Sequence, residues 1–114
     1  MKSPITTHIL DTMAGTPAAG VGVALQLRKN DGEWKELARG VSDSDGRIMD
    51  LLPPNTRLAV GTYRLIFETG EYFRRKNIEG FYPRIAVEFE WKNNGHYHLP
   101  LLLSPFGYVT YRGS

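Results

Sequence analysis

The sequence predicts an all-β protein, an antiparallel β-sandwich of about seven to eight short strands with one short helix. The dominant hydrophobic period is two, which is the period of a half-buried strand. The alternating segments are short and separated by Gly, Asn, Asp and Pro, and no helices alternate with them as a parallel α/β sheet would require. A chain of 114 residues, 41% of them apolar, has the size of one domain, so we expect residues 1–114 to form a single domain.

The first half of the chain is predicted to contain a β-hairpin followed by a turn. Apolar side chains occupy every second position of residues 21–30, which predicts a strand with one buried face. Residues 30–32, Asn-Asp-Gly, tolerate positive φ, and residues 33–41 resume extended character, so the two segments are predicted to pair through this turn. Residues 42–46, Ser-Asp-Ser-Asp-Gly, then form a polar turn.

Two further strands enclose the one predicted helix. Large apolar side chains stand at every second position in residues 57–69 and again in residues 84–92, a pattern typical of strands. Between them, residues 71–78 lack this alternation and carry Tyr72 and Lys76 at helical spacing. We therefore expect a short helix over residues 71–78.

The C-terminal part is predicted to form two more strands. Residues 96–104 and 108–112 have extended character, and residues 105–107, Pro-Phe-Gly, separate them. Residues 93–95, Asn-Asn-Gly, have the composition of a hairpin turn, so we expect a hairpin there as well.

Composition excludes several functional classes. Without cysteine the protein has no disulfide, thiolate metal site or cysteine nucleophile. The net charge is only +2, and the densest basic cluster, residues 74–76, is too short for a nucleic-acid-binding face. The N-terminus lacks the apolar core of a secretory signal, and no segment approaches the ~20 apolar residues of a membrane span. We therefore expect a cytoplasmic protein with no nucleic-acid or membrane partner.

The three histidines, His8, His96 and His98, are the residues best suited to exchange protons near neutral pH. His96 and His98 lie two apart on a predicted strand, so both project from one face, which is directed at solvent or at another subunit. They are either surface residues, general acid–base groups or, together with His8, ligands of a zinc ion with one open position. The opposite face, apolar enough to be the core, carries Tyr97, Leu99, Leu101 and Leu103.

Arg47 and Ser114 are further candidates for contact with a ligand. Arg47 follows a polar turn, and its guanidinium can hold a planar carbonyl or carboxylate with two hydrogen bonds, although a solvated surface arginine is the alternative. Ser114, the last residue, carries both a hydroxyl and the terminal carboxylate. Because residues 108–114 keep strand character to their end, a docked terminus is favoured over a frayed tail.

Four motifs occur together in this chain. Residues 111–114, Tyr-Arg-Gly-Ser, end it, preceded by a His-Tyr-His pattern in residues 96–98. Thr-His-Ile-Leu-Asp at residues 7–11 is followed by Gly-Thr-Pro-Ala at residues 15–18. In order and spacing these motifs resemble the 5-hydroxyisourate hydrolases, also called transthyretin-like or transthyretin-related proteins, and the resemblance covers essentially the whole chain. Two shorter matches lie between them, Asp45-Gly46-Arg47 and Phe81-Tyr82-Pro83.

The resemblance implies a transthyretin-like sandwich assembled as a homotetramer, a dimer of dimers, with active sites in a central channel at the interface between dimers. It also implies the hydrolysis of 5-hydroxyisourate, the unstable product of urate oxidation, to 2-oxo-4-hydroxy-4-carboxy-5-ureidoimidazoline in purine catabolism. No cofactor or metal is needed in that family.

Carried over by motif, the resemblance assigns the family's active-site histidines and arginine to His8, His98 and Arg47, and gives His96 a supporting role. The tail residues line the same channel in the family. Val109 departs from the family, where serine is usual, and this puts fine positioning of the tail in doubt more than the activity. The predicted catalytic residues are His8, Arg47, His98 and Ser114. The predicted substrate-binding residues are His8, Arg47, Tyr111, Arg112 and Gly113.

Two alternatives remain beside the metal-independent hydrolase. A small-molecule carrier without catalysis is the first, because the vertebrate carrier transthyretin shares the fold and a comparable channel; the histidines, Arg47 and the tail favour the enzyme branch. A zinc hydrolase using His8, His96 and His98 is the second, and activity that persists after chelation would exclude it.

Overall fold

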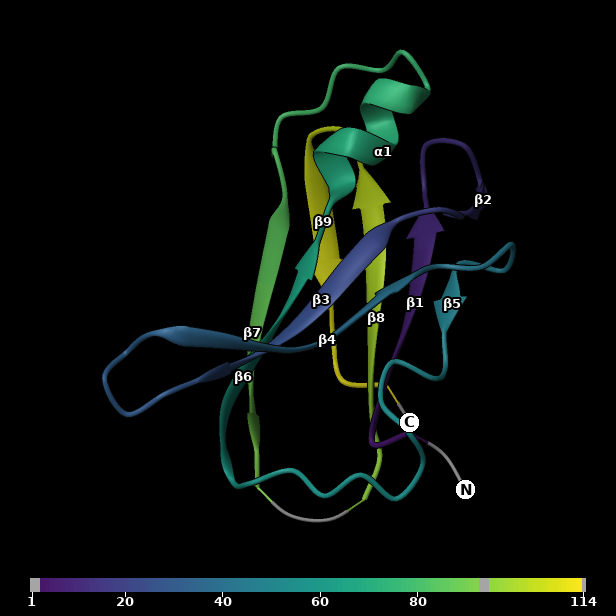
Figure 1. The fold of residues 1–114 in the computed structure, drawn as a ribbon. Coiled ribbons are helices and arrows are strands. Elements are labelled where there is room, and N and C mark those ends of the chain that lie inside the picture. Colours follow the sequence, from purple (N-terminus) through teal and green to yellow (C-terminus); the bar gives the residue numbers. More distant parts are fainter. Residues whose placement is uncertain (1–2, 93–94, 114) are drawn as a thin grey trace.

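The computed structural model describes residues 3–92 and 95–113, which form a β-sandwich of two sheets with one short helix (Figure 1). In the first sheet the order is β4 (Trp34–Val41), β3 (Gly22–Arg28), β6 (Gly61–Phe67) and β7 (Ile85–Trp91). In the second it is β2 (Thr16–Pro17), β1 (Ile5–Asp11), β8 (Tyr97–Ser104) and β9 (Gly107–Thr110), with β5 (Arg47–Ile48) also paired to β1. The predicted fold class is therefore confirmed.

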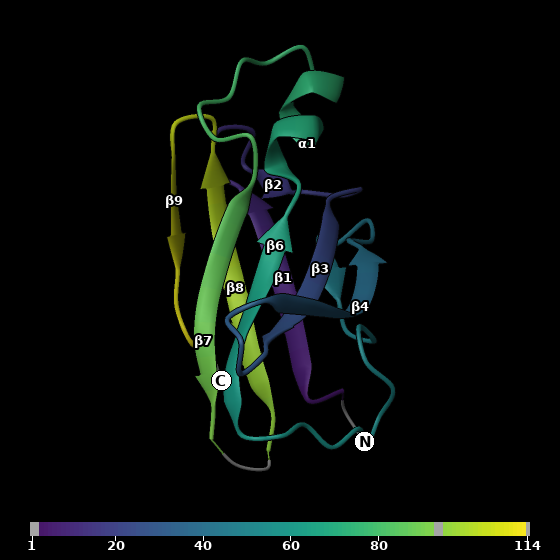
Figure 2. The same ribbon diagram turned by 60° about the vertical axis from the view of Figure 1, so that its left-hand side comes forward.

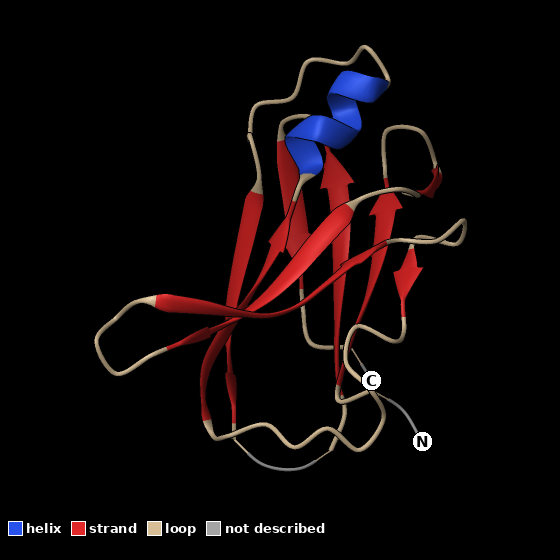
Figure 3. Cartoon of the chain, in the orientation of Figure 1, coloured by secondary structure: helices blue, strands red, loops and turns tan. Residues whose placement is uncertain are grey.

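The helix α1, Thr69–Arg75, begins two residues before the predicted range and ends three residues before its end. It lies above one end of the two sheets (Figure 3). Asn77 adopts a positive φ of 57° and its N–H donates to the Arg74 carbonyl at 3.0 Å, an arrangement that terminates a helix. Helical spacing in the sequence predicted where the helix lies, but its end is set by the left-handed conformation of Asn77. Among the described residues no helix has the length and apolar character needed to cross a membrane.

Strand pairing departs from the sequence prediction at two points. The strands β7 and β8 belong to different sheets, so residues 93–95 do not join a hairpin, and residues 93 and 94 lie outside the described residues. The strands β1 and β8 run parallel, the one parallel pair among the described strands. Both differences are tertiary, because the composition of a turn does not say which strand the chain joins next.

The core lies between the two sheets and is made by the predicted alternating faces. Leu25, Leu65 and Leu101 are fully buried, and Tyr97 belongs to the same core. Figure 2 shows the two sheets from another side. Because side chains alternate along β8, burial of its odd-numbered residues turns His98 to the outer face of the second sheet.

A buried carboxylate ties α1 to the end of β1. Asp11 is 1% exposed, and its Oδ2 accepts a hydrogen bond from the Tyr72 hydroxyl at 2.8 Å, while its Oδ1 accepts one from the Ala14 N–H at 2.9 Å. Burial, and then the hydrogen bond to Asp11, raise the pKa of Tyr72, so the phenol keeps the proton that it donates. The Lys76 ammonium lies 3.8 Å from the same carboxylate. These contacts fix the end of β1 that lies next to α1, and β1 is the strand that carries His8.

Candidate active site

Strand β1 brings the predicted site residues together by pairing with β5 on one side and β8 on the other. His8 lies opposite Arg47 of β5 and opposite Pro100 of β8. Two residues earlier along β1, Thr6 lies opposite His98. Residues two apart or directly opposite project from the same face of a sheet. His8, Arg47 and His98 therefore share the outer face of the second sheet, as neighbours in two adjacent rows.

A tight turn presents Arg47 to β1. The Asp43 carboxylate accepts hydrogen bonds from the N–H of Asp45 at 2.9 Å and of Arg47 at 3.0 Å. Gly46 has a φ of 75°, and its carbonyl accepts the N–H of Ile9 at 2.7 Å. A Cβ at Gly46 would collide with the Ile9 carbonyl oxygen, so only glycine lets the turn lie this close to β1. The predicted polar turn leads directly into the short strand β5, where Arg47 is exposed.

The tail lies along β8, as expected of a docked terminus. Thr110 of β9 lies opposite Leu101, and Gly113 forms an isolated bridge with His98 in the same antiparallel register. The Gly113 N–H donates to the His98 carbonyl at 2.7 Å. The tail therefore reaches the row that holds His98. Ser114, predicted to be catalytic, lies outside the described residues.

Replacing Gly113 with alanine is expected to lower kcat by about 10-fold to 100-fold, because a small misplacement in an active site carries a cost of this size. A Cβ there would lie 2.9 Å from Cδ2 of His98 and 3.3 Å from Cγ of Pro100, so the tail or the imidazole must shift. Steady-state kinetics checks this. Gly107→Ala is the matched control, because its Cβ would meet only the Ser104 Oγ at 3.7 Å. Equal kinetics for the two variants would contradict the close approach.

The guanidinium of Arg112, a predicted substrate-binding residue of the tail, lies in a different place from the histidines. The Arg112 guanidinium lies 4.2 Å from the centre of the Tyr97 ring, and Tyr97 belongs to the inward face of β8. Tyr111, 55% exposed, and Arg112 both line a hollow of about 380 Å³ between β7 and the tail. The structure thus separates the Arg112 guanidinium from the face that carries His98. The hollow is also lined by Val87, Glu88, Phe89, Glu90, Lys92, Leu99 and Thr110.

Sequence reasoning missed Thr6, which links His98 of β8 to His96, the residue just before that strand. Its Oγ1 lies 2.8 Å from Nδ1 of His98 and 3.0 Å from Nε2 of His96. The Nδ1 of His96 lies 2.8 Å from the carbonyl oxygen of Ser3. Thr6 shares the even-numbered face of β1 with His8, but nothing in the sequence tells which strand lies beside the His-X-His segment.

Among the described residues, this arrangement does not provide the ligand cluster that the zinc alternative requires. Within residues 3–92 and 95–113, no three His, Asp or Glu side chains are grouped so that they could hold a metal ion. The hydroxyl of Thr6 stands between the imidazoles of His96 and His98 instead. The outer face instead carries imidazole nitrogens beside an exposed guanidinium. Such groups can transfer protons and stabilise negative charge.

Comparison with known sequences identifies relatives along the whole chain. A family model described as the HIUase/Transthyretin family matches residues 5–113. The 5-hydroxyisourate hydrolase of Salmonella dublin is 51% identical over 111 residues, covering 96% of this chain and 80% of that protein. The 5-hydroxyisourate hydrolase of Mus musculus is 44% identical over 115 residues, covering 99% and 97%.

Solved structures with the same fold include transthyretins and a 5-hydroxyisourate hydrolase. Sea bream transthyretin in complex with thyroxine superposes with a TM-score of 0.91 at 35% identity, covering 97% of this chain and 95% of that one. The 5-hydroxyisourate hydrolase of Klebsiella pneumoniae superposes with a TM-score of 0.86 at 39% identity, covering 98% and 100%. Backbone similarity alone therefore does not separate a thyroxine-binding transthyretin from a 5-hydroxyisourate hydrolase.

Proposed function

Because the chain belongs to the HIUase/transthyretin family, we propose that the outer face carrying His8, Arg47 and His98 is the active site of a 5-hydroxyisourate hydrolase. The enzyme opens the ring of 5-hydroxyisourate, forming 2-oxo-4-hydroxy-4-carboxy-5-ureidoimidazoline. One observation supports the assignment of the site: the pairing of β1 with β5 and β8 turns two imidazoles and a guanidinium to the same face, in two adjacent rows. The predicted cytoplasmic location stays a prediction.

The reaction sets three requirements. Water adds to a ring carbonyl carbon, and the adjacent carbon–nitrogen bond then breaks to leave a carboxylic acid and a ureido nitrogen. A base must take a proton from the water, and a cation or hydrogen-bond donor must stabilise the oxyanion that forms. A donor must return a proton to the departing nitrogen. Imidazoles and a guanidinium can meet all three requirements without a metal ion.

We assign the proton from water to His98 and the stabilisation of charge to Arg47. The Arg47 guanidinium is exposed, so it can hold the oxygens of a planar substrate with two parallel hydrogen bonds. His8 lies directly opposite Arg47 and diagonal to His98, where it can share the proton handling. The substrate then lies across both rows, with its reacting carbonyl between His98 and Arg47.

The tail and a second pair of subunits are proposed to close the site. Gly113 brings the tail to the edge of His98, and Tyr111 and Ser114 are proposed to make hydrogen bonds to the substrate ring or its carbonyls. Arg112 is proposed to hold the tail from the opposite face through Tyr97. A homotetramer of the transthyretin type would cover the outer face, exclude water and strengthen each electrostatic contact there.

An ultraviolet time course tests the function. Urate oxidase generates 5-hydroxyisourate in place, and its decay is followed with and without this protein. We expect acceleration over the unaided decay and the same acceleration after EDTA treatment. Loss of activity on chelation would favour the zinc alternative, and decay at the unaided rate would favour a carrier, to be pursued by ligand binding to the same face.

A further inference from the structure

We infer that Thr6 and His96 are positioning residues that hold His98 in the tautomer with its proton on Nδ1. Four groups form a continuous chain of contacts on the outer face. The Ser3 carbonyl contacts His96, His96 contacts the Thr6 hydroxyl, and Thr6 contacts His98. This inference rests on the proposed function only where it assigns a role in catalysis.

The direction of each hydrogen bond in this series follows from its last member, the Ser3 carbonyl. A carbonyl oxygen accepts but never donates, so Nδ1 of His96 carries the proton in that contact. In the neutral imidazole the other nitrogen, Nε2, is then an acceptor. The partner of Nε2 at 3.0 Å is the Thr6 hydroxyl, which must donate its only proton to it.

The same reasoning then reaches His98. With its proton committed to His96, the Thr6 oxygen can only accept from its second partner, Nδ1 of His98 at 2.8 Å. Nδ1 of His98 therefore carries the proton, and in the neutral ring the lone pair lies on Nε2. That is the state a general base needs at Nε2, and it parallels the way an orienting group selects the tautomer of a catalytic histidine.

Because its members are buried, this series of hydrogen bonds is suited to orienting the His98 ring rather than to conducting protons. Thr6 is 0% exposed, and the rings of His96 and His98 are nearly parallel, with their planes 14° apart and their centroids 6.4 Å apart. Ser3 is 2% exposed, and its Oγ accepts the Leu52 N–H at 3.3 Å and donates to the Ile5 carbonyl at 3.0 Å. The far end is thus a fixed, buried backbone acceptor, which holds a proton in place but cannot release it.

The hydrogen bonds of this series also stay intact when His98 takes up a proton. Protonation at Nε2 leaves Nδ1–H donating to Thr6, so no hydrogen bond reverses during the reaction. A base that gains and returns a proton in each turnover benefits from a partner that accepts in both states, because no reorganisation is needed.

The test compares Thr6→Val, which keeps the shape but loses the hydroxyl, with Thr6→Ser, which keeps the hydroxyl. We expect Thr6→Val to lower kcat by about 10-fold to 100-fold, the usual cost of removing an orienting partner, with KM changed much less. Thr6→Ser should stay near the wild-type kcat. Thr56→Val, at a half-buried threonine whose hydroxyl donates to the Pro53 carbonyl at 2.6 Å, controls for loss of a hydroxyl elsewhere.

A spectroscopic arm reads the tautomer directly and does not depend on activity. Long-range ¹H–¹⁵N spectra of the histidine rings should show His98 with its proton on Nδ1 in the wild type, and a shift toward the Nε2–H form in Thr6→Val. If Thr6→Val fails to fold, His96→Ala replaces it, because Thr6 can then donate to His98 and release the tautomer.

Two results would overturn the inference: an Nε2–H tautomer of His98 in the wild type, or a folded Thr6→Val enzyme with wild-type kcat. Failure of the proposed function looks different, since the wild-type protein would then not accelerate decay of 5-hydroxyisourate while the spectra still report the tautomer.

Discussion

Replacing His98 with alanine is expected to lower kcat by about 10² to 10⁴-fold, the usual contribution of a general base. The loss should fall on kcat more than on KM, because the proton moves in the transition state and the ring is not the main contact with the bound substrate. Steady-state kinetics with 5-hydroxyisourate generated by urate oxidase measures both constants. Thermal unfolding of the same samples establishes that the variant is folded.

Two comparisons separate lost chemistry from a disturbed strand. Added imidazole should restore part of the rate to His98→Ala, because it can enter the space left by the ring and act as the base. His96→Ala, two residues earlier on the same face, should lose less activity, since His96 acts only through Thr6. A folded His98→Ala enzyme with wild-type kcat would rule out His98 as the base.

Replacing Arg47 with alanine is expected to lower kcat/KM by about 10² to 10³-fold, which is the range for removing a donor to a developing oxyanion. Unlike the His98 variant, Arg47→Ala should also raise KM, because the guanidinium holds substrate oxygens before and during the reaction. Kinetics over a wide range of substrate concentration resolves the two effects.

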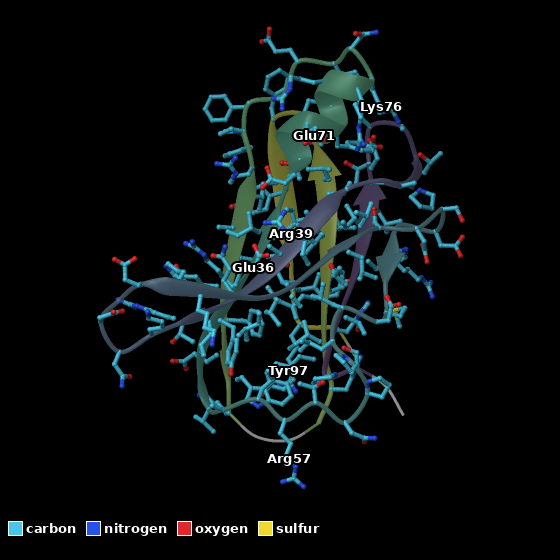
Figure 4. All side chains as sticks on the ribbon, in the orientation of Figure 1. Glu36, Arg39, Arg57, Glu71, Lys76 and Tyr97 are labelled. Atoms are coloured by element: carbon cyan, nitrogen blue, oxygen red, sulfur yellow. The ribbon has the colours of Figure 1, made fainter. Side chains whose placement is uncertain are left out.

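The chain offers matched controls for Arg47. Arg57, in the segment between β5 and β6, points away from the sheets (Figure 4), so Arg57→Ala removes the same charge without touching the outer face. Arg47→Lys keeps the charge but loses the paired hydrogen bonds, and we expect it to recover only part of the activity. Equal losses for Arg47→Ala and Arg57→Ala would show that overall charge, not a contact, is responsible.

Much of the fold was predictable because local pattern and burial agree. The alternation in residues 21–30, 57–69 and 84–92 is that of β3, β6 and β7, whose inward side chains form one wall of the core. The outward direction of His98 followed from the apolar residues that flank it in β8. The sequence of β1, Ile-Thr-Thr-His-Ile-Leu-Asp, has no comparable alternation of apolar and polar residues. Its buried side chains include the adjacent polar residues Thr6 and Thr7.

The site was predictable in its residues but not in its arrangement. His8, Arg47 and His98 came from residue chemistry and from motifs that resemble a family, and the structure places all three on one face. The role of Thr6 was not predictable, because it depends on Thr6 standing opposite His98 in a neighbouring strand. Likewise, the tail motif did not reveal that Arg112 turns to the inward face of β8 and rests on Tyr97.

The sequence by itself determined that the alternating segments, such as residues 21–30, 57–69 and 84–92, become strands, which of their side chains are buried, and which residue types are available for proton transfer. These properties depend on neighbours within a few positions along the chain, where side-chain alternation and turn chemistry act. Only the tertiary structure decided that β1 runs parallel to β8 with Thr6 opposite His98, and that β5 brings Arg47 beside His8. Register between strands about 90 residues apart is chosen by packing of the whole core, because a slip of one residue would turn every side chain to the other face.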